Sequence, residues 1–188
     1  EQLFGFSSRD HRLHTKGQDW QFDTDGSASA WVDNATLLVA SARALHRFYI
    51  TTGKLDDICP LEANNAVTRS NDGRADPQGG FWIGTMGINA EDGAGAIYRY
   101  YKGTLRLLFA PITISNAICF APDGKTAYFT DTPTQKIMRV ALDAEGWPKG
   151  APELHIDLSD TDFRPDRAVA DAAGNLWHPQ WGPGRVAG

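Results

Sequence analysis

Polar side chains able to bind a metal ion or a sugar interrupt three apolar stretches of this sequence. Arg69, Asn71 and Asp72 precede the strand-like segment "FWIG", while Asn116 lies within "ITISNAICF" and Asp166 within "FRPDRAVAD". Carboxylate and carboxamide oxygens are hard ligands that suit Ca²⁺, Mg²⁺ or Mn²⁺ and, less specifically, Zn²⁺ or Fe²⁺. One such ion can polarise a carbonyl and lower the pKa of a bound water. That chemistry hydrolyses esters and lactones without a serine nucleophile.

Each of these side chains also has a structural explanation. A buried carboxamide such as Asn116 costs desolvation free energy unless it finds a partner, and its alternative role is to cap a bulge in a sheet. We favour a functional role for Asn116. For Asp166, the spacing alone favours an ordinary Pro-Asp turn. The five histidines show no ligand spacing, and the sequence has no Gly-x-Ser-x-Gly elbow, His-Glu-x-x-His motif, phosphate-binding Gly-x-x-x-x-Gly-Lys loop or EF-hand loop.

The elements that position these side chains repeat along the chain. Four Asp-led turns, at Asp33, Asp76, Asp123 and Asp171, are each followed by a short apolar strand, and they lie 43, 47 and 48 positions apart. After three of them comes a second strand in which apolar residues flank one Arg: "LHRF", "IYRY" and "IMRV". A repeat of roughly 40 to 50 residues is typical of a four-stranded propeller blade.

The sequence therefore predicts an all-β fold, a β-propeller, with about four blades' worth of chain and a partial blade at each end. We expect residues 1–188 to form a single, partial propeller domain. Closed propellers usually have about four to eight blades. Because the innermost strands of the blades line one central channel, polar residues far apart in the sequence can meet at its mouth.

Composition excludes several classes of partner. The 188 residues carry a formal net charge of -5 without a Lys/Arg cluster, which argues against nucleic acid. No apolar run approaches the roughly 20 residues that span a bilayer, and the first residues lack the features of a signal peptide. We expect a soluble, cytoplasmic protein that has no membrane partner, with Cys59 and Cys119 as reduced core thiols.

Long motifs, in order, give the sequence a family resemblance. "RSNDGRADPQGGFWIGTM", "ITISNAICFAPDGKTAYFTDT", "RPDRAVADAAGNLW" and "WGPGRV" together cover most of residues 62–186. With them, the sequence resembles the SMP-30/gluconolactonase/regucalcin family, six-bladed propellers that hydrolyse sugar lactones with one divalent metal. The resemblance implies a divalent metal cofactor, with Ca²⁺ as the first choice and Zn²⁺, Mn²⁺, Mg²⁺ or Fe²⁺ as alternatives. It also implies a small sugar lactone as the substrate, whereas the oligomeric state is left open.

The resemblance assigns roles to individual residues. Asn116 matches a metal ligand, and Asp166 matches a second ligand that also acts as the catalytic general base. Arg69 and Asn71 match residues that hold the substrate's oxygens. By contrast, we expect Asp76, Gly79 and Gly80 to make the turn into the following strand, and Asp72 and Gly73 to fix the shape of a loop.

Two departures from the family pattern bear on this assignment. The family's third ligand is a Glu in a Gly-Glu-Gly-Pro motif before the first blade; the context of Glu1 does not match it, so we expect a chain truncated at both ends. The family's Pro-Asp-Gly is here Pro165-Asp166-Arg167, which puts a long cation beside the proposed base. If Arg167 points into the site, it competes with the metal.

The sequence leaves other functions open. Instead of a metal-dependent lactone hydrolase, the protein could be a non-catalytic metal-binding or interaction propeller, or an inactive fragment of the lactonase. A third hypothesis is a sugar-binding propeller with Trp82, Trp177 and Trp181 as stacking platforms. For Trp82 and Trp177, which stand in strand patterns, we favour core packing.

Overall fold

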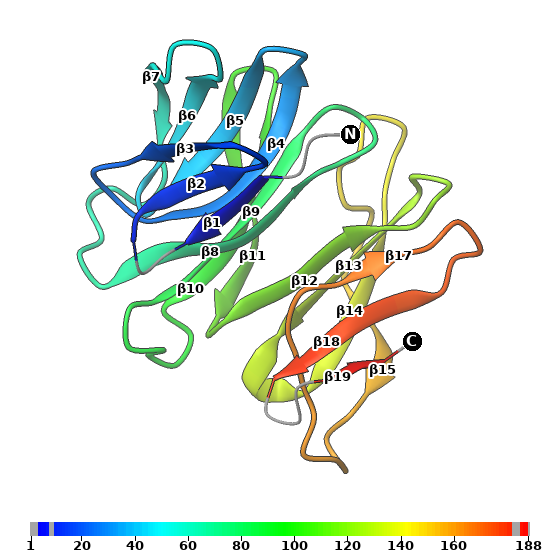
Figure 1. Cartoon of the computed structure of the whole chain (residues 1–188). Coiled ribbons are helices and arrows are strands. Elements are labelled where there is room, and N and C mark those ends of the chain that lie inside the picture. Colours follow the sequence, from blue (N-terminus) through cyan, green and yellow to red (C-terminus); the bar gives the residue numbers. More distant parts are fainter. Residues whose placement is uncertain (1–3, 8–9, 182–184, 188) are drawn as a thin grey trace.

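Five antiparallel sheets make up the part of the chain that the computed structural model describes, residues 4–7, 10–181 and 185–187 (Figure 1). In hydrogen-bonded order, the sheets are β1 (Phe4–Ser7), β2 (Arg12–Thr15) and β3 (Gln18–Gln21); β4 (Gly26–Asp33), β5 (Thr36–Ser41), β6 (Ala44–Tyr49) and β7 (Leu55–Pro60); β8 (Thr68–Ala75), β9 (Phe81–Gly87), β10 (Gly95–Tyr101) and β11 (Thr104–Ile112); β12 (Ser115–Phe120), β13 (Thr126–Asp131), β14 (Lys136–Ala141) and β15 (Glu153–Asp157); and β16 (Arg164–Pro165), β18 (Leu176–Trp181) and β17 (Val169–Ala170), with β19 (Arg185–Ala187) also paired with β18. A short 3₁₀ helix, η1 (Thr132–Thr134), follows β13.

The sheets are arranged as the blades of a propeller. The first strand of each sheet contacts the first strand of the next, in the order β1, β4, β8 and β12, and β12 contacts β17 of the last sheet. The all-β propeller fold is confirmed, but the expected count of about four blades is corrected to five sheets. Residues 4–21 form a three-stranded sheet that contains none of the four repeated aspartates and lies where a partial blade was expected before the first repeat.

The repeated aspartates all make the same local hydrogen bond. Each Oδ1 accepts from the backbone N–H two residues later, at 2.8 to 3.0 Å, which closes the turn that leads into β5, β9, β13 or β18. An Asp side chain that bonds its own backbone in this way stabilises a turn without help from the rest of the fold. The regular spacing of the aspartates in the sequence is therefore the spacing of these turns along the chain.

The hydrophobic core is divided into layers between neighbouring sheets. Four clusters of buried side chains each combine residues of two adjacent sheets. In β5, Leu37 and Val39 pack toward the first sheet, whereas Leu38 and Ala40 pack toward the third. A middle strand is thus buried on both faces, which explains why these strands are continuous apolar runs rather than alternating ones.

The arginines of the second-strand motifs have different environments. Arg47 and Arg139 are exposed, whereas the side chain of Arg99 is 0% exposed. Arg99 Nε donates to Asp76 Oδ2 at 2.6 Å, and its guanidinium carbon lies 4.3 and 4.4 Å from the ring centroids of Tyr101 and Trp147. Its Nη2 also donates to the carbonyl of Glu145, so this one side chain links the third sheet to the fourth.

The tryptophans considered as stacking platforms differ in their exposure to solvent. Trp82 is fully buried in the cluster between the third and fourth sheets, as expected. The expectation of core packing is wrong for Trp177, which is 44% exposed because its Nε1–H donates outward to Asp171 Oδ2. The side chain of Trp181 lies outside the described residues.

Cys59 and Cys119 are free cysteines. In the described part of the chain, no helix has the length and apolar character to span a bilayer.

Candidate active site

Two β-bulges on neighbouring inner strands place the central carboxamides. In β8 the pairing with β9 shifts between Ser70 and Gly73, the stretch that holds Asn71. In β12 the pairing with β13 shifts after Asn116, where Ala117 adopts a left-handed φ of 56°. Bulges re-aim side chains, and strained backbone of this kind gathers at functional sites. The structure therefore contains the bulge that we considered for Asn116, with its side chain directed to neighbouring strands.

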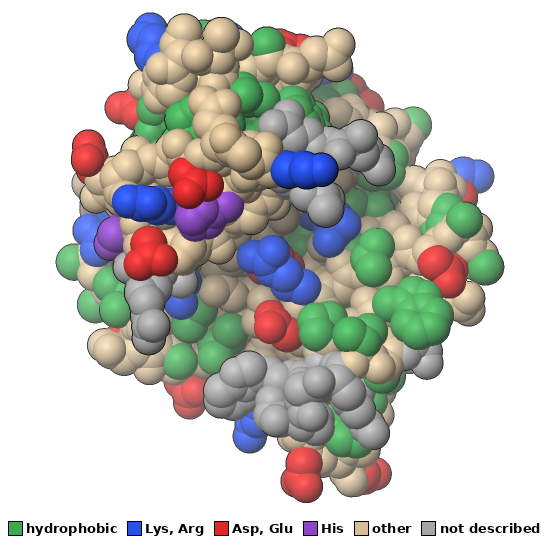
Figure 2. Space-filling model, viewed as in Figure 1, with side chains coloured by type: hydrophobic (Ala, Val, Ile, Leu, Met, Phe, Trp, Pro, Cys, Tyr) green, Lys and Arg blue, Asp and Glu red, His purple; other side chains and the backbone are tan. Residues whose placement is uncertain are grey.

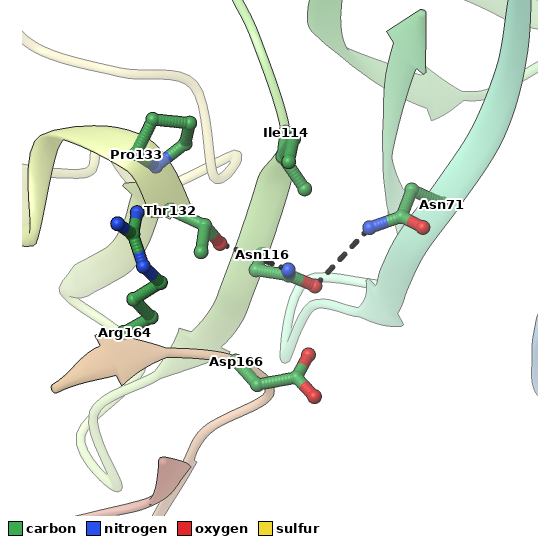
Figure 3. Close-up of a pocket in the computed structure, with 7 residues that line it drawn as sticks. All are labelled: Asn71, Ile114, Asn116, Thr132, Pro133, Arg164 and Asp166. Carbon is green, nitrogen blue, oxygen red and sulfur yellow. Dashed lines mark hydrogen bonds between the residues drawn. The ribbon is translucent and has the colours of Figure 1, made fainter. Parts of the chain in front are cut away.

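A chain of hydrogen bonds crosses three sheets through these residues. Arg69 Nη1 donates to Asn71 Oδ1 at 3.2 Å, and Asn71 Nδ2 donates to Asn116 Oδ1 at 3.2 Å (Figure 3). Asn116 Nδ2 donates to Thr132 Oγ1 at 3.0 Å, and Thr132 Oγ1 donates to the carbonyl of Pro165 at 2.9 Å. The chain thus fixes the position of Asn116 relative to the strand that precedes Asp166.

The bond from Thr132 to Pro165 favours one of the two orientations of the carboxamide of Asn116. Thr132 uses its only proton on Pro165, so it must accept from Asn116, and the atom next to it is Nδ2. Asn116 Oδ1 then lies 3.2 Å from Asp166 Oδ1. Turning the amide over would let Nδ2 donate to Asp166 Oδ1 and to the carbonyl of Ser115, each at 3.2 Å, and let Oδ1 accept from Thr132. It would also place Nδ2 against Nδ2 of Asn71, which already donates to the carbonyl of Ser115 at 2.9 Å, and would take from Pro165 the proton of Thr132.

The facing oxygens lie in a pocket of about 380 Å³, the Asp166 pocket. Its lining residues are Asn71, Ile114, Asn116, Thr132, Pro133, Arg164 and Asp166 (Figure 3). Asn116 is 7% exposed, and Asp166 is half-buried at the end of β16, with its backbone N–H donating to the carbonyl of Pro179 at 3.1 Å. The polar groups of this pocket come from β8, β12, η1, β16 and the residue that follows β16.

The donor set fits a hard divalent cation. Asn116 Oδ1 and Asp166 Oδ1 are acceptor oxygens 3.2 Å apart, and a cation bound to both would offset their mutual repulsion. Among the described residues, no three His, Cys, Asp or Glu side chains cluster as metal ligands, so Asn116 and Asp166 form an incomplete set that needs further oxygens. Glu1, which we did not assign as a ligand, lies outside the described residues.

The structure brings three of the four expected site residues together. Asn71, Asn116 and Asp166 line one pocket, whereas Arg69 bonds to Asn71 and lines a neighbouring pocket. Asp76, Gly79 and Gly80 form the turn into β9, because Asp76 Oδ1 accepts from the N–H of Gly80 at 2.8 Å and Gly79 has a φ of 84°.

The loop expected at Asp72 and Gly73 is instead part of β8. Asp72 is 6% exposed, and its Oδ2 accepts from the N–H of Ile118 at 3.0 Å, which ties β8 to β12. Burial raises the pKa of this carboxyl above its ordinary value. The expectation was wrong because hydrogen-bonding side chains such as these are common in turns. Nothing in the sequence shows that they belong to a bulged strand that bonds to the neighbouring sheet.

Arg167 points away from the proposed base. Its Nε lies 3.9 Å from Asp72 Oδ1, and its Nη2 donates to the carbonyl of Ser27 at 3.3 Å. The structure shows no ion pair between Arg167 and Asp166. Sequence reasoning also missed Thr132 and Arg164; the signal for Thr132 was its place at the end of β13, next to the strand that carries Asn116.

The fold is a propeller-like arrangement of five sheets with a polar oxygen-lined pocket on its inner strands, and comparison with known proteins defines the family. A family model described as SMP-30/Gluconolactonase/LRE-like region matches residues 7–188. The chain belongs to this family.

Similar proteins are known by sequence and by structure. A Rhizobium meliloti (strain 1021) protein named "Putative sugar lactone lactonase" is 45% identical over 86% of this chain and 55% of its own length, and an Azospirillum brasilense L-arabinolactonase is 36% identical over 82% and 52%. A crystal structure from Agrobacterium tumefaciens str. C58, described as a calcium-binding protein, regucalcin, superposes with a TM-score of 0.95 at 41% identity over 98% of this chain and 65% of that one. The chain spans about half the length of the curated relatives it matches.

Proposed function

We propose that the protein hydrolyses a sugar lactone with the help of one divalent metal. The observation that carries this proposal is the pair formed by Asn116 Oδ1 and Asp166 Oδ1, 3.2 Å apart in a pocket that also holds Asn71. The relatives named as lactonases and the calcium-binding neighbour support the same class of reaction and cofactor. Calcium is the first choice of metal.

Asn116 and Asp166 would hold the metal. When bound, the ion supplies Lewis-acid chemistry, polarising the lactone carbonyl and lowering the pKa of a nearby water. Asp166 accepts the proton of the attacking water and returns it to the ring oxygen as the ester C–O bond breaks, which gives the sugar hydroxyl and a carboxylic acid that ionises to the carboxylate. The bond from Nδ2 to Thr132 keeps the carboxamide oxygen of Asn116 turned toward Asp166.

Arg69 and Asn71 orient the sugar. The guanidinium of Arg69 has five N–H donors, of which the structure uses Nη1 for the carbonyl of Ser70 and for Asn71 Oδ1. Its other donors remain for the substrate's hydroxyl and ring oxygens. Because Asn71 bonds both to Arg69 and to Asn116, the sugar-binding and metal-binding groups keep a fixed separation.

The test is hydrolysis of D-gluconolactone and other aldonolactones by the whole protein, followed with a pH indicator. Asp166→Asn keeps the shape of the side chain and removes its charge, so we expect turnover to fall by about a hundredfold or more while the fold is retained. Asp160→Asn, at an exposed position, is the matched control and should leave turnover unchanged. Full turnover by Asp166→Asn refutes the proposed role, and metal binding without turnover in the unaltered protein indicates a binding propeller instead.

A further inference from the structure

A second pocket of about 420 Å³ adjoins the proposed active site. It shares Asn71 with the Asp166 pocket, and its wall includes Arg69, Ser27, Asp25 and Arg167; we refer to it as the Arg167 pocket. Figure 2 shows Lys and Arg side chains gathered near the middle of this hollowed face. A molecule that extends from one pocket to the other would pass Asn71.

Two guanidinium groups in the Arg167 pocket have few partners. Arg69 has no carboxylate within ion-pair distance among the described residues, and its bonds go to a backbone carbonyl and to Asn71. Arg167 donates to the carbonyl of Ser27, and its nearest acid, Asp72, is 3.9 Å away. Its side chain is 63% exposed. Both groups therefore keep N–H donors for a ligand.

Two acidic side chains lie nearby. Asp25 lies 2.7 Å from His11, whereas Asp72 accepts from a backbone N–H of β12 through Oδ2 and has its Oδ1 3.9 Å from Arg167. Arg74, in a further pocket that also includes Ser27 and Arg167, adds a third guanidinium whose hydrogen bonds go to backbone carbonyls. Three guanidinium groups thus lie on two pockets that share Ser27 and Arg167, and the lining of these pockets includes one carboxylate, that of Asp25.

We propose that the Arg167 pocket binds an anionic group on the lactone, at the end of the sugar remote from the carbonyl, and that Arg167 is a specificity-determining residue for such acidic lactones. The proposal rests on the proposed function, because it places the carbonyl in the Asp166 pocket. A neutral sugar uses donors of Arg69 but leaves the free donors of Arg167 to water. A phosphate, sulfonate or carboxylate group accepts charge-assisted hydrogen bonds from both Arg69 and Arg167.

Binding of a matched pair of ligands tests this pocket independently of lactone hydrolysis. D-glucitol 6-phosphate and D-glucitol differ only in the anionic group, and neither can be hydrolysed as a lactone. By calorimetry on the whole protein, we expect the phosphate to bind at least about tenfold more tightly than D-glucitol. Arg167→Gln should remove most of that difference.

Arg139→Gln is the matched control, because it removes an exposed arginine of β14. It should leave both affinities unchanged. Equal affinity of the unaltered protein for the two polyols overturns the proposal. Equal effects of Arg167→Gln and Arg139→Gln on the phosphate also overturn it.

Hydrolysis then separates this inference from the proposed function. We expect kcat/KM for 6-phospho-D-gluconolactone to exceed that for D-gluconolactone, and Arg167→Gln to lower the ratio by about tenfold. If both lactones are hydrolysed equally well and Arg167→Gln changes both alike, the inference is overturned and the proposed function stands. If neither is hydrolysed while Arg167-dependent binding of the phosphate persists, the proposed function fails and the anion-binding pocket stands.

Discussion

The buried ion pair between Arg99 and Asp76, within the third sheet, is the polar contact whose removal should cost the most stability. Both side chains are 0% exposed, and Arg99 also bonds to the fourth sheet through the carbonyl of Glu145. The perturbation is Arg99→Met, which keeps much of the length of the side chain and removes the guanidinium. Asp76 Oδ1 keeps its two backbone donors, whereas Oδ2 loses its partner and stays buried.

The expected loss follows from that orphaned charge. Removing one partner of a buried ion pair destabilises a protein by about 3–5 kcal/mol. For a chain of this size, that corresponds to a fall in Tm of roughly 6–20 °C. Arg139→Met is the matched control, since Arg139 occupies the equivalent place in the "IMRV" strand and makes an exposed ion pair with Glu153 at 3.3 Å. Its removal should cost about 1 kcal/mol or less.

The assay is urea unfolding at pH 7, followed by tryptophan fluorescence, with the unaltered protein and the two variants side by side. We expect the free energy of unfolding of Arg99→Met to lie at least about 2 kcal/mol below that of Arg139→Met. The reasoning is refuted if the two variants lose equal stability. It is also refuted if Arg99→Met loses less than about 1 kcal/mol, because the buried carboxylate would then have found another partner.

Three further predictions concern the site, the last sheet and the buried thiol. Thr132→Val removes the group that orients Asn116, so calorimetric Ca²⁺ affinity should fall by about tenfold or more; an unchanged affinity contradicts this role. Hydrogen bonds, first among them that from Trp177, lower the pKa of Asp171 to about 2. The stability they contribute is present above the ordinary pKa and is lost as pH falls toward 2. Asp171→Asn should therefore flatten the decline in Tm between pH 4 and pH 2, and an identical decline argues against the linkage. Burial raises the pKa of Cys119 to about 12, so a thiol reagent at pH 8 should label it only after unfolding; labelling of the native protein contradicts its burial.

Local chemistry explains why so much of the fold could be predicted from the sequence. The Asp-led turns are closed by bonds within three residues, so their spacing in the chain is also the spacing of the blades. The burial of the second-strand arginines could not be predicted in this way. Arg99 and Arg139 stand in nearly the same motif, yet one is buried and the other exposed, because Trp147 and Glu145 of the next sheet cover only Arg99.

The residues of the candidate site could be selected from the sequence by their type, but the contacts between them could not be predicted. Asn116 and Asp166 could be selected because a carboxamide and a carboxylate break apolar segments and match a family motif. Their separation of 3.2 Å depends on the bulge after Asn116 and on the bond to Thr132, and the geometry of neither can be read from the sequence. The direction of Arg167 was equally hidden, since it depends on the position of Ser27, 140 residues away in the sequence.

A crystal structure of the whole protein grown with Mn²⁺ tests the central claim most directly, because anomalous scattering identifies the ion. The account predicts a manganese peak within about 2.6 Å of both Asn116 Oδ1 and Asp166 Oδ1, with Asn116 Nδ2 still bonded to Thr132. A structure with no such peak, or with the amide nitrogen of Asn116 donating to Asp166, contradicts the assignment of these residues as metal ligands and with it the proposed metal-dependent hydrolysis.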